Sequence, residues 1–69
     1  MNNFKISLAA ARVNSGMTQD AVAEALHVSK TTVGNWEKGK TIPSLATISV
    51  LSSIYKIPAD NIFLPKEST

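Results

Sequence analysis

The apolar positions of this chain recur every three or four residues, which is the spacing of one face of an α-helix, in stretches separated by short polar turns. The first stretch predicts a helix from about Phe4 to Asn14, with Asn2 or Asn3 as its N-cap and Gly16 just beyond its end. Its inward face consists of Phe4, Leu8 and Ala11.

Two short helices follow, joined by a tight turn. Thr18 is a suitable N-cap for a helix from about Gln19 to Leu26, and Ser29 for a helix from about Lys30 to Lys38. The first of these has barely two turns, so packing must hold it in place. A turn of three residues with the apolar Val28 in its corner predicts that the two axes cross steeply, as in a helix-turn-helix motif.

The fourth stretch has a clear amphipathic pattern. Ser44 caps a helix whose inward residues recur at spacings of three and four, namely Leu45, Ile48, Leu51, Ser52 and Tyr55. A last helical turn opens at Pro58, and we expect the tail from Leu64 to Thr69 to fray. No strand alternation is visible, so the pattern predicts an all-α fold of five short helices in a single domain over residues 1–69, with its core in about residues 4–63.

Composition narrows the class of protein. The chain has 69 residues, seven basic and five acidic, with a net charge of +2 and an isoelectric point near 9.2, which permits an anionic partner. It lacks cysteine and has one histidine, so we expect neither disulfides nor a metal site, and no cofactor site is evident. No apolar run is long enough for a membrane span and the start lacks a signal-peptide pattern, so we expect a cytoplasmic protein.

Enzyme chemistry has little support. The one histidine lies in a helix turn, the acidic residues are scattered instead of paired, and no glycine-rich phosphate loop is present. We therefore expect no catalytic residues.

Residues from about Leu8 to Phe63 together resemble the helix-turn-helix domains of Cro and lambda repressor, the xenobiotic-response-element (XRE) family. The resemblance rests on short pieces in a fixed order: Arg12, Thr18-Gln19, Ala23, Val28-Ser29, Val33, Trp36-Glu37-Lys38-Gly39-Lys40, Pro43-Ser44 and Tyr55-Lys56-Ile57-Pro58-Ala59-Asp60. It implies a DNA-binding transcriptional regulator whose third helix enters the major groove.

On this basis two groups of residues are expected to contact DNA. The base-contacting group lies on the third helix and comprises Lys30, Thr31, Gly34 and Asn35. The group that holds phosphates comprises Gln19, Ser29, Thr32, Lys38, Lys40 and Thr41. Without the family resemblance, these side chains could be interpreted as an ordinary solvated face of a helix. Their clustering argues otherwise, because three lysines and one acid lie between Ser29 and Ser44.

That acid, Glu37, is expected to form a buried structural pair with Arg12, which would tie the first helix to the end of the third. Trp36 could stack on a base, but its spacing from Val33 favours a scaffold role.

Two positions depart from the family pattern. His27 stands where relatives usually have glycine, because the backbone there tends to be left-handed; histidine tolerates this at a cost near 1 kcal/mol. It could act as a pH switch, but the absence of an obvious charged partner favours a passive residue. Gly34 stands where relatives commonly carry a polar contact residue, and both close approach to DNA and simple tolerance of a small residue remain open.

A domain this small spans little DNA, so we expect a weak homodimer, reinforced on a pseudo-palindromic operator. The expected dimer contact is the last helical turn, with Pro58, Ala59, Phe63 and Leu64. The hypothesis is a phage, prophage or bacterial repressor of Cro type. The alternative is a protein-interaction module on the same fold, either antitoxin-like or coactivator-like.

Overall fold

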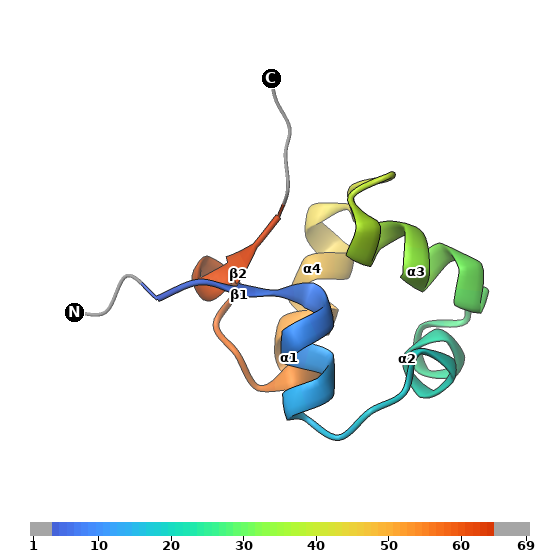
Figure 1. The fold of residues 1–69 in the computed structure, drawn as a ribbon, viewed down its shortest axis with the longest axis horizontal. Coiled ribbons are helices and arrows are strands. Elements are labelled where there is room, and N and C mark those ends of the chain that lie inside the picture. The colour runs from blue at the N-terminus through green and yellow to red at the C-terminus, as the bar shows by residue number, and fades with distance from the viewer. Residues whose placement is uncertain (1–3, 65–69) are drawn as a thin grey trace.

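The computed structural model describes residues 4–64, which form α-helices packed around one core and a short parallel sheet that joins the two ends (Figure 1). The elements are β1 (Ile6–Ser7), α1 (Leu8–Asn14), α2 (Gln19–Leu26), α3 (Lys30–Lys38), α4 (Leu45–Tyr55), the 3₁₀ turn η1 (Ala59–Asn61) and β2 (Ile62–Phe63). The all-α helix-turn-helix fold is confirmed, and α2 and α3 have the predicted bounds. Within residues 4–64, no helix has the length and apolar character to cross a membrane.

The first helix is shorter than predicted, because it begins at Leu8 and not near Phe4. Ser7 is its N-cap: the backbone there is extended (φ −70°, ψ 159°), and the side-chain Oγ accepts a hydrogen bond from the backbone N of Ala10 at 3.1 Å. The asparagine caps predicted at positions 2 and 3 lie outside the described residues. A serine three residues before Ala10 is the local signal that marks the true start.

The prediction of a purely helical chain is wrong at its two ends. The strands β1 and β2 run parallel, with Ile6 opposite Ile62 and Ser7 opposite Phe63. Both isoleucines are buried by this arrangement. The predicted fifth helix is therefore only the single 3₁₀ turn η1, because the chain must become extended directly after it to pair with β1.

Two side-chain hydrogen bonds hold the η1 turn against the segment before α1. Lys5 Nζ donates to the backbone oxygen of Asp60 at 2.6 Å, and Asn61 Nδ2 donates to the backbone oxygen of Phe4 at 2.6 Å. The two ends of the described chain are thus fastened to each other on the side of the molecule away from α2 (Figure 1).

The core lies between the four helices and the β1–β2 pair. Its largest fully buried side chains are Leu51, Val22 and Val33. Trp36 is only 8% exposed, which confirms its scaffold role. The inward stripe of α4 begins one turn later than predicted, because Leu45 is 86% exposed and Ile48 is the first buried residue of that helix.

The predicted fraying of the tail concerns mainly residues 65–69, which lie outside the described residues. Leu64 itself is partly buried and packs against the core, so the prediction is wrong for this residue. The β1–β2 pair explains this, because it holds the chain against the helices up to Phe63.

The turn between α2 and α3 has the left-handed backbone that was expected at His27 (φ 59°, ψ 44°). Its backbone N–H donates to the oxygens of Ala23 and Glu24, so the residue closes α2. Lys56 closes α4 in the same conformation (φ 59°), which the sequence did not indicate.

His27→Gly is expected to raise the free energy of unfolding by about 0.5 to 1 kcal/mol, because glycine adopts this conformation without the clash of a Cβ atom. Urea denaturation of the two proteins measures the difference. Glu24→Gly, in the interior of α2, is the matched control and should lower the free energy of unfolding by a similar amount. A lower midpoint for His27→Gly would contradict the strain argument.

Candidate nucleic-acid interface

The helix α3 lies at the outside of the fold, packed mainly against α2, and buries only Val33 and Trp36 (Figure 1). Ser29 caps its N-terminus through a hydrogen bond from the backbone N of Thr32 to its Oγ at 3.0 Å. At the other end Gly39 takes a left-handed backbone (φ 79°). One long face of a rigid, well-capped helix is therefore left at the surface.

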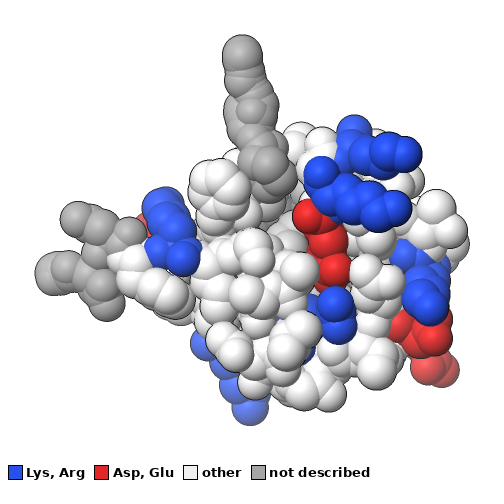
Figure 2. Space-filling view, in the orientation of Figure 1, with Lys and Arg blue, Asp and Glu red and all other residues white. Residues whose placement is uncertain are grey.

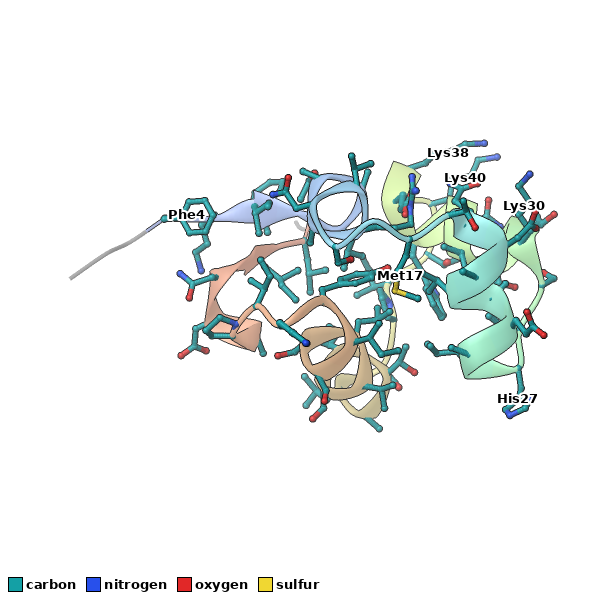
Figure 3. The ribbon with its side chains drawn as sticks, turned by 90° about the horizontal axis from the view of Figure 1, so that it is seen from below. Phe4, Met17, His27, Lys30, Lys38 and Lys40 are labelled. Carbon is teal, nitrogen blue, oxygen red and sulfur yellow. The ribbon has the colours of Figure 1, made fainter. Side chains whose placement is uncertain are left out.

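Three lysines project from the same side of the molecule as this face. Lys30, Lys38 and Lys40 are exposed and point the same way, whereas His27 lies on the opposite side of the view (Figure 3). Figure 2 shows basic side chains distributed over the surface around α3. The backbone N of Lys40 donates to the oxygen of Asn35 at 2.9 Å, which fixes the start of the loop relative to the helix.

The single acid of this region, Glu37, is neutralised by Arg12 of α1. Arg12 Nε lies 2.7 Å from Glu37 Oε2, and the two side chains are 16% and 8% exposed. Arg12 Nη1 also donates to the backbone oxygen of Met17 at 2.9 Å. The hydrogen bond to Glu37 raises the pKa of Arg12 above its ordinary value, although burial acts in the opposite direction. Glu37 therefore does not offset the positive charges of the three lysines, although further acidic side chains lie beside the basic one at the right of Figure 2.

The structure shows a contact between Gln19 and α3, while the predicted contact of Gln19 with a phosphate stays a prediction. Its Nε2 donates to Glu37 Oε1 at 2.8 Å, so the side chain braces α2 against α3. The amide nitrogen carries a second hydrogen, which could be donated to a phosphate while the first holds Glu37.

The other predicted contact residues are brought together around α3. Thr31 is exposed, Asn35 and Gly34 are partly exposed on the helix, and Thr41 is exposed in the following loop. Ser29 and Thr32 are engaged with each other, because their hydroxyl oxygens are 3.0 Å apart. The Ser29 hydroxyl also caps α3, so a phosphate bound here would share these hydroxyls with the contacts inside the protein.

Comparison with known proteins adds evidence that is independent of this geometry. A family model described as helix-turn-helix matches residues 8–62. The chain belongs to this family. The predicted resemblance to XRE-type regulators of the Cro and lambda-repressor kind is thereby confirmed.

This helix-turn-helix domain is also similar to the HTH-type transcriptional activator BcrR of Enterococcus faecalis, with 30% identity over 64 residues. The match covers 93% of the chain and 31% of the relative, so the chain spans about a third of that protein. No solved structure matches the chain.

The predicted dimer residues lie away from the helix-turn-helix, at the end of the molecule that carries β1 and β2 (Figure 1). Pro58 and Ala59 are exposed and Phe63 is 53% exposed, while Leu64 is partly buried. These residues are accessible to a partner, and they do not overlap with the face of α3.

Tyr55 lies in the core of the helix-turn-helix domain, near the Arg12–Glu37 pair. Burial of the ring, together with the charge of Glu37, raises the pKa of Tyr55 to about 12 from an ordinary value of 10.0. The folded state thus favours the neutral phenol more strongly than the unfolded state does. The resulting stability is fully present below pH 10 and is lost as the pH rises toward 12.

Tyr55→Phe is expected to weaken this loss of stability at alkaline pH, because the phenylalanine ring cannot ionise. A shift of this size corresponds to about 2 to 3 kcal/mol between pH 10 and 12 in the wild-type protein. Urea denaturation of both proteins at pH 8, 10, 11 and 12 measures it, and the difference between them cancels the titration of the lysines. Parallel pH profiles for the two proteins would contradict the shifted pKa.

Proposed function

We propose that this domain is a sequence-specific transcriptional regulator that places α3 in the major groove of double-stranded DNA. Lys30, Thr31 and Asn35 would contact base edges from its exposed face. Lys38, Lys40 and Thr41 would contact the phosphates on the far side of the helix. The DNA that such a protein binds would lie in the bacterial nucleoid.

The observation that carries the proposal is the exposed lysine cluster with its neutralised acid. Lys30, Lys38 and Lys40 lie on the side of α3 that faces away from the core, and Glu37 among them is occupied by Arg12 at 2.7 Å. A surface whose positive charges are not internally compensated attracts a polyanion and releases counterions when it binds. The rigid capped helix between the lysines has the shape that a major groove admits.

Selection of bound duplexes from a random pool tests the proposal and returns the site. Fluorescence anisotropy on the selected duplex, at increasing salt, then measures affinity. We expect the logarithm of the binding constant to fall linearly with the logarithm of the salt concentration. If duplex binding is absent, or insensitive to salt, the proposal fails and a protein-interaction module becomes the better interpretation.

We further propose that two copies bind one pseudo-palindromic operator. The domain is 34 Å in its longest dimension, close to one turn of B-DNA, so a single copy can occupy only one face of one turn. A second copy that contacts Pro58, Ala59, Phe63 and Leu64 would present its own α3 to the next turn. The small exposed area predicts a weak dimer in free solution, strengthened on DNA.

Phe63→Glu is expected to abolish the complex of two chains per operator and to weaken operator binding, because a charge would replace an apolar contact. Sedimentation of the free protein and of the complex measures the stoichiometry. Leu45→Glu is the matched control, because Leu45 is also apolar and is 86% exposed at the start of α4. If Leu45→Glu breaks the dimer and Phe63→Glu does not, the interface lies at α4 instead.

We propose repression, in a phage, prophage or bacterial context, as the regulatory outcome. A protein that occupies promoter DNA blocks transcription with no surface beyond those already described, whereas activation needs a further contact with the transcription machinery. The name of the Enterococcus relative states activation for that longer protein. A reporter gene downstream of the selected operator decides the question, since expression of the chain should lower its transcription and a rise would overturn repression.

A further inference from the structure

Gly34 lies midway along α3, where it is partly exposed beside Gln19 of α2, and neither the fold nor the packing requires a glycine there. Its backbone is ordinary right-handed helix, unlike the left-handed Gly16 and Gly39. A Cβ atom built at Gly34 would meet only Gln19 Nε2, at 3.9 Å, which is ordinary van der Waals contact. Glycine is nevertheless among the least favourable residues in a helix interior. The domain thus keeps a residue that weakens α3 without any internal benefit.

The position of Gly34 suggests where the benefit lies. Lys30 and Lys38 are four residues before and after it, and Thr31 is three residues before it, so all three surround it on the helix surface. The missing side chain leaves a shallow depression between longer ones. In a complex with DNA, this depression lets the backbone of α3 approach the bases by about the depth of one methyl group.

The chemistry of the depression selects what can fill it. Gly34 itself offers no side-chain donor or acceptor, and the one side-chain atom near its Cβ position, Gln19 Nε2, is bonded to Glu37. A polar base edge placed against Gly34 would therefore lose its water without gaining a hydrogen bond from this residue. The one apolar group that base pairs present in the major groove is the 5-methyl group of thymine.

We propose that Gly34 determines specificity by receiving the 5-methyl group of one thymine in each half-site. The inference rests on the proposed major-groove binding by α3 and names the base group that this position recognises. It also explains why alanine is absent: an added methyl group would occupy the space of the thymine methyl and hold Lys30 and Thr31 away from their bases.

Replacement of single thymidines by deoxyuridine tests the inference, because the change removes only the methyl group. The probes are the selected operator and a set of duplexes in which each thymidine of the half-site is replaced in turn. We expect one deoxyuridine position to weaken wild-type binding about three- to fivefold, the effect of one buried methyl group. Gly34→Ala should bind the normal operator roughly five- to tenfold more weakly than wild type. With deoxyuridine at the same position, this variant should lose nothing further or recover affinity.

Ser53→Ala is the matched control for the substitution itself. Ser53 is exposed on α4, and alanine there also improves helix propensity without touching α3. Both variants should raise the melting temperature, and Ser53→Ala should bind the operator as wild type does. A lower melting temperature for Gly34→Ala would show that the fold needs this glycine and would overturn the inference.

The inference and the proposed function fail in different ways. Equal deoxyuridine effects in the wild type and Gly34→Ala, unchanged affinity of Gly34→Ala, or a selected half-site without thymine would each overturn the role of Gly34 while DNA binding stands. Absence of salt-sensitive binding by the wild type would remove the proposed function itself.

Discussion

Glu37→Ala is expected to lower the free energy of unfolding by about 3 kcal/mol or more, because it leaves the Arg12 guanidinium largely buried without its counter-charge. The same change removes the acceptor of the Gln19 amide. A domain of 69 residues has a total stability of only about 3 to 10 kcal/mol. The variant should therefore be unfolded or close to its midpoint at room temperature.

Urea denaturation followed by far-ultraviolet circular dichroism measures this loss. Glu24→Ala is the matched control, because Glu24 is an exposed acid on α2 without an ion pair among the described residues, and we expect a change within about 0.5 kcal/mol. Glu37→Gln keeps an acceptor for Arg12 and should fall between the two. Equal midpoints for Glu37→Ala and Glu24→Ala would show that the pair contributes nothing to stability.

The magnitude of this effect follows from the place of Glu37 in the fold. Its carboxylate receives hydrogen bonds from Arg12 on α1 and from Gln19 at the start of α2, and its charge reaches Tyr55 on α4. One residue near the end of α3 is thus hydrogen-bonded to both α1 and α2. The orientation of α3, which we propose enters the major groove, depends on these contacts, so partial loss of stability should also weaken operator binding.

Helix termini were predictable because their signals are local. Thr18, Ser29 and Ser44 each accept a hydrogen bond from the backbone N–H three residues ahead, and each is recognisable from the sequence alone. The left-handed turn at His27 followed from the resemblance and not from the residue itself. Where the deciding contact lies within one turn of helix, the sequence was sufficient.

Contacts between distant residues were not predictable in the same way. The β1–β2 pair joins Ile6 to Ile62 across two-residue strands, which are too short to show an alternating pattern. The hydrogen bond from Gln19 to Glu37 joins residues 18 positions apart, and no local pattern in the sequence indicates it. Leu45 fits the spacing of the α4 stripe, but the helix begins beyond the edge of the core.

Lys30→Ala is expected to weaken binding to the selected operator by about 1 to 3 kcal/mol and to relax the preference at one base pair of the half-site. Lys30 is the first residue of α3 and is exposed, which is where the N-terminal residues of a groove-bound helix meet base edges. Lys40 follows the helix in the loop, where we propose that it contacts the DNA backbone. Lys40→Ala should therefore weaken binding to all duplexes alike and reduce the salt slope by about one unit.

Anisotropy titrations on the operator and on single-base variants, each at several salt concentrations, separate the two lysines. Lys56→Asn is the matched control, because it removes a positive charge at the C-cap of α4, and asparagine tolerates its left-handed backbone. It should change neither specificity nor slope. Identical behaviour of Lys30→Ala and Lys40→Ala would contradict the division between base contact and phosphate contact. Selectivity would then reside in Thr31, Gly34 and Asn35, because these are the remaining predicted base-contacting positions on the exposed face of α3.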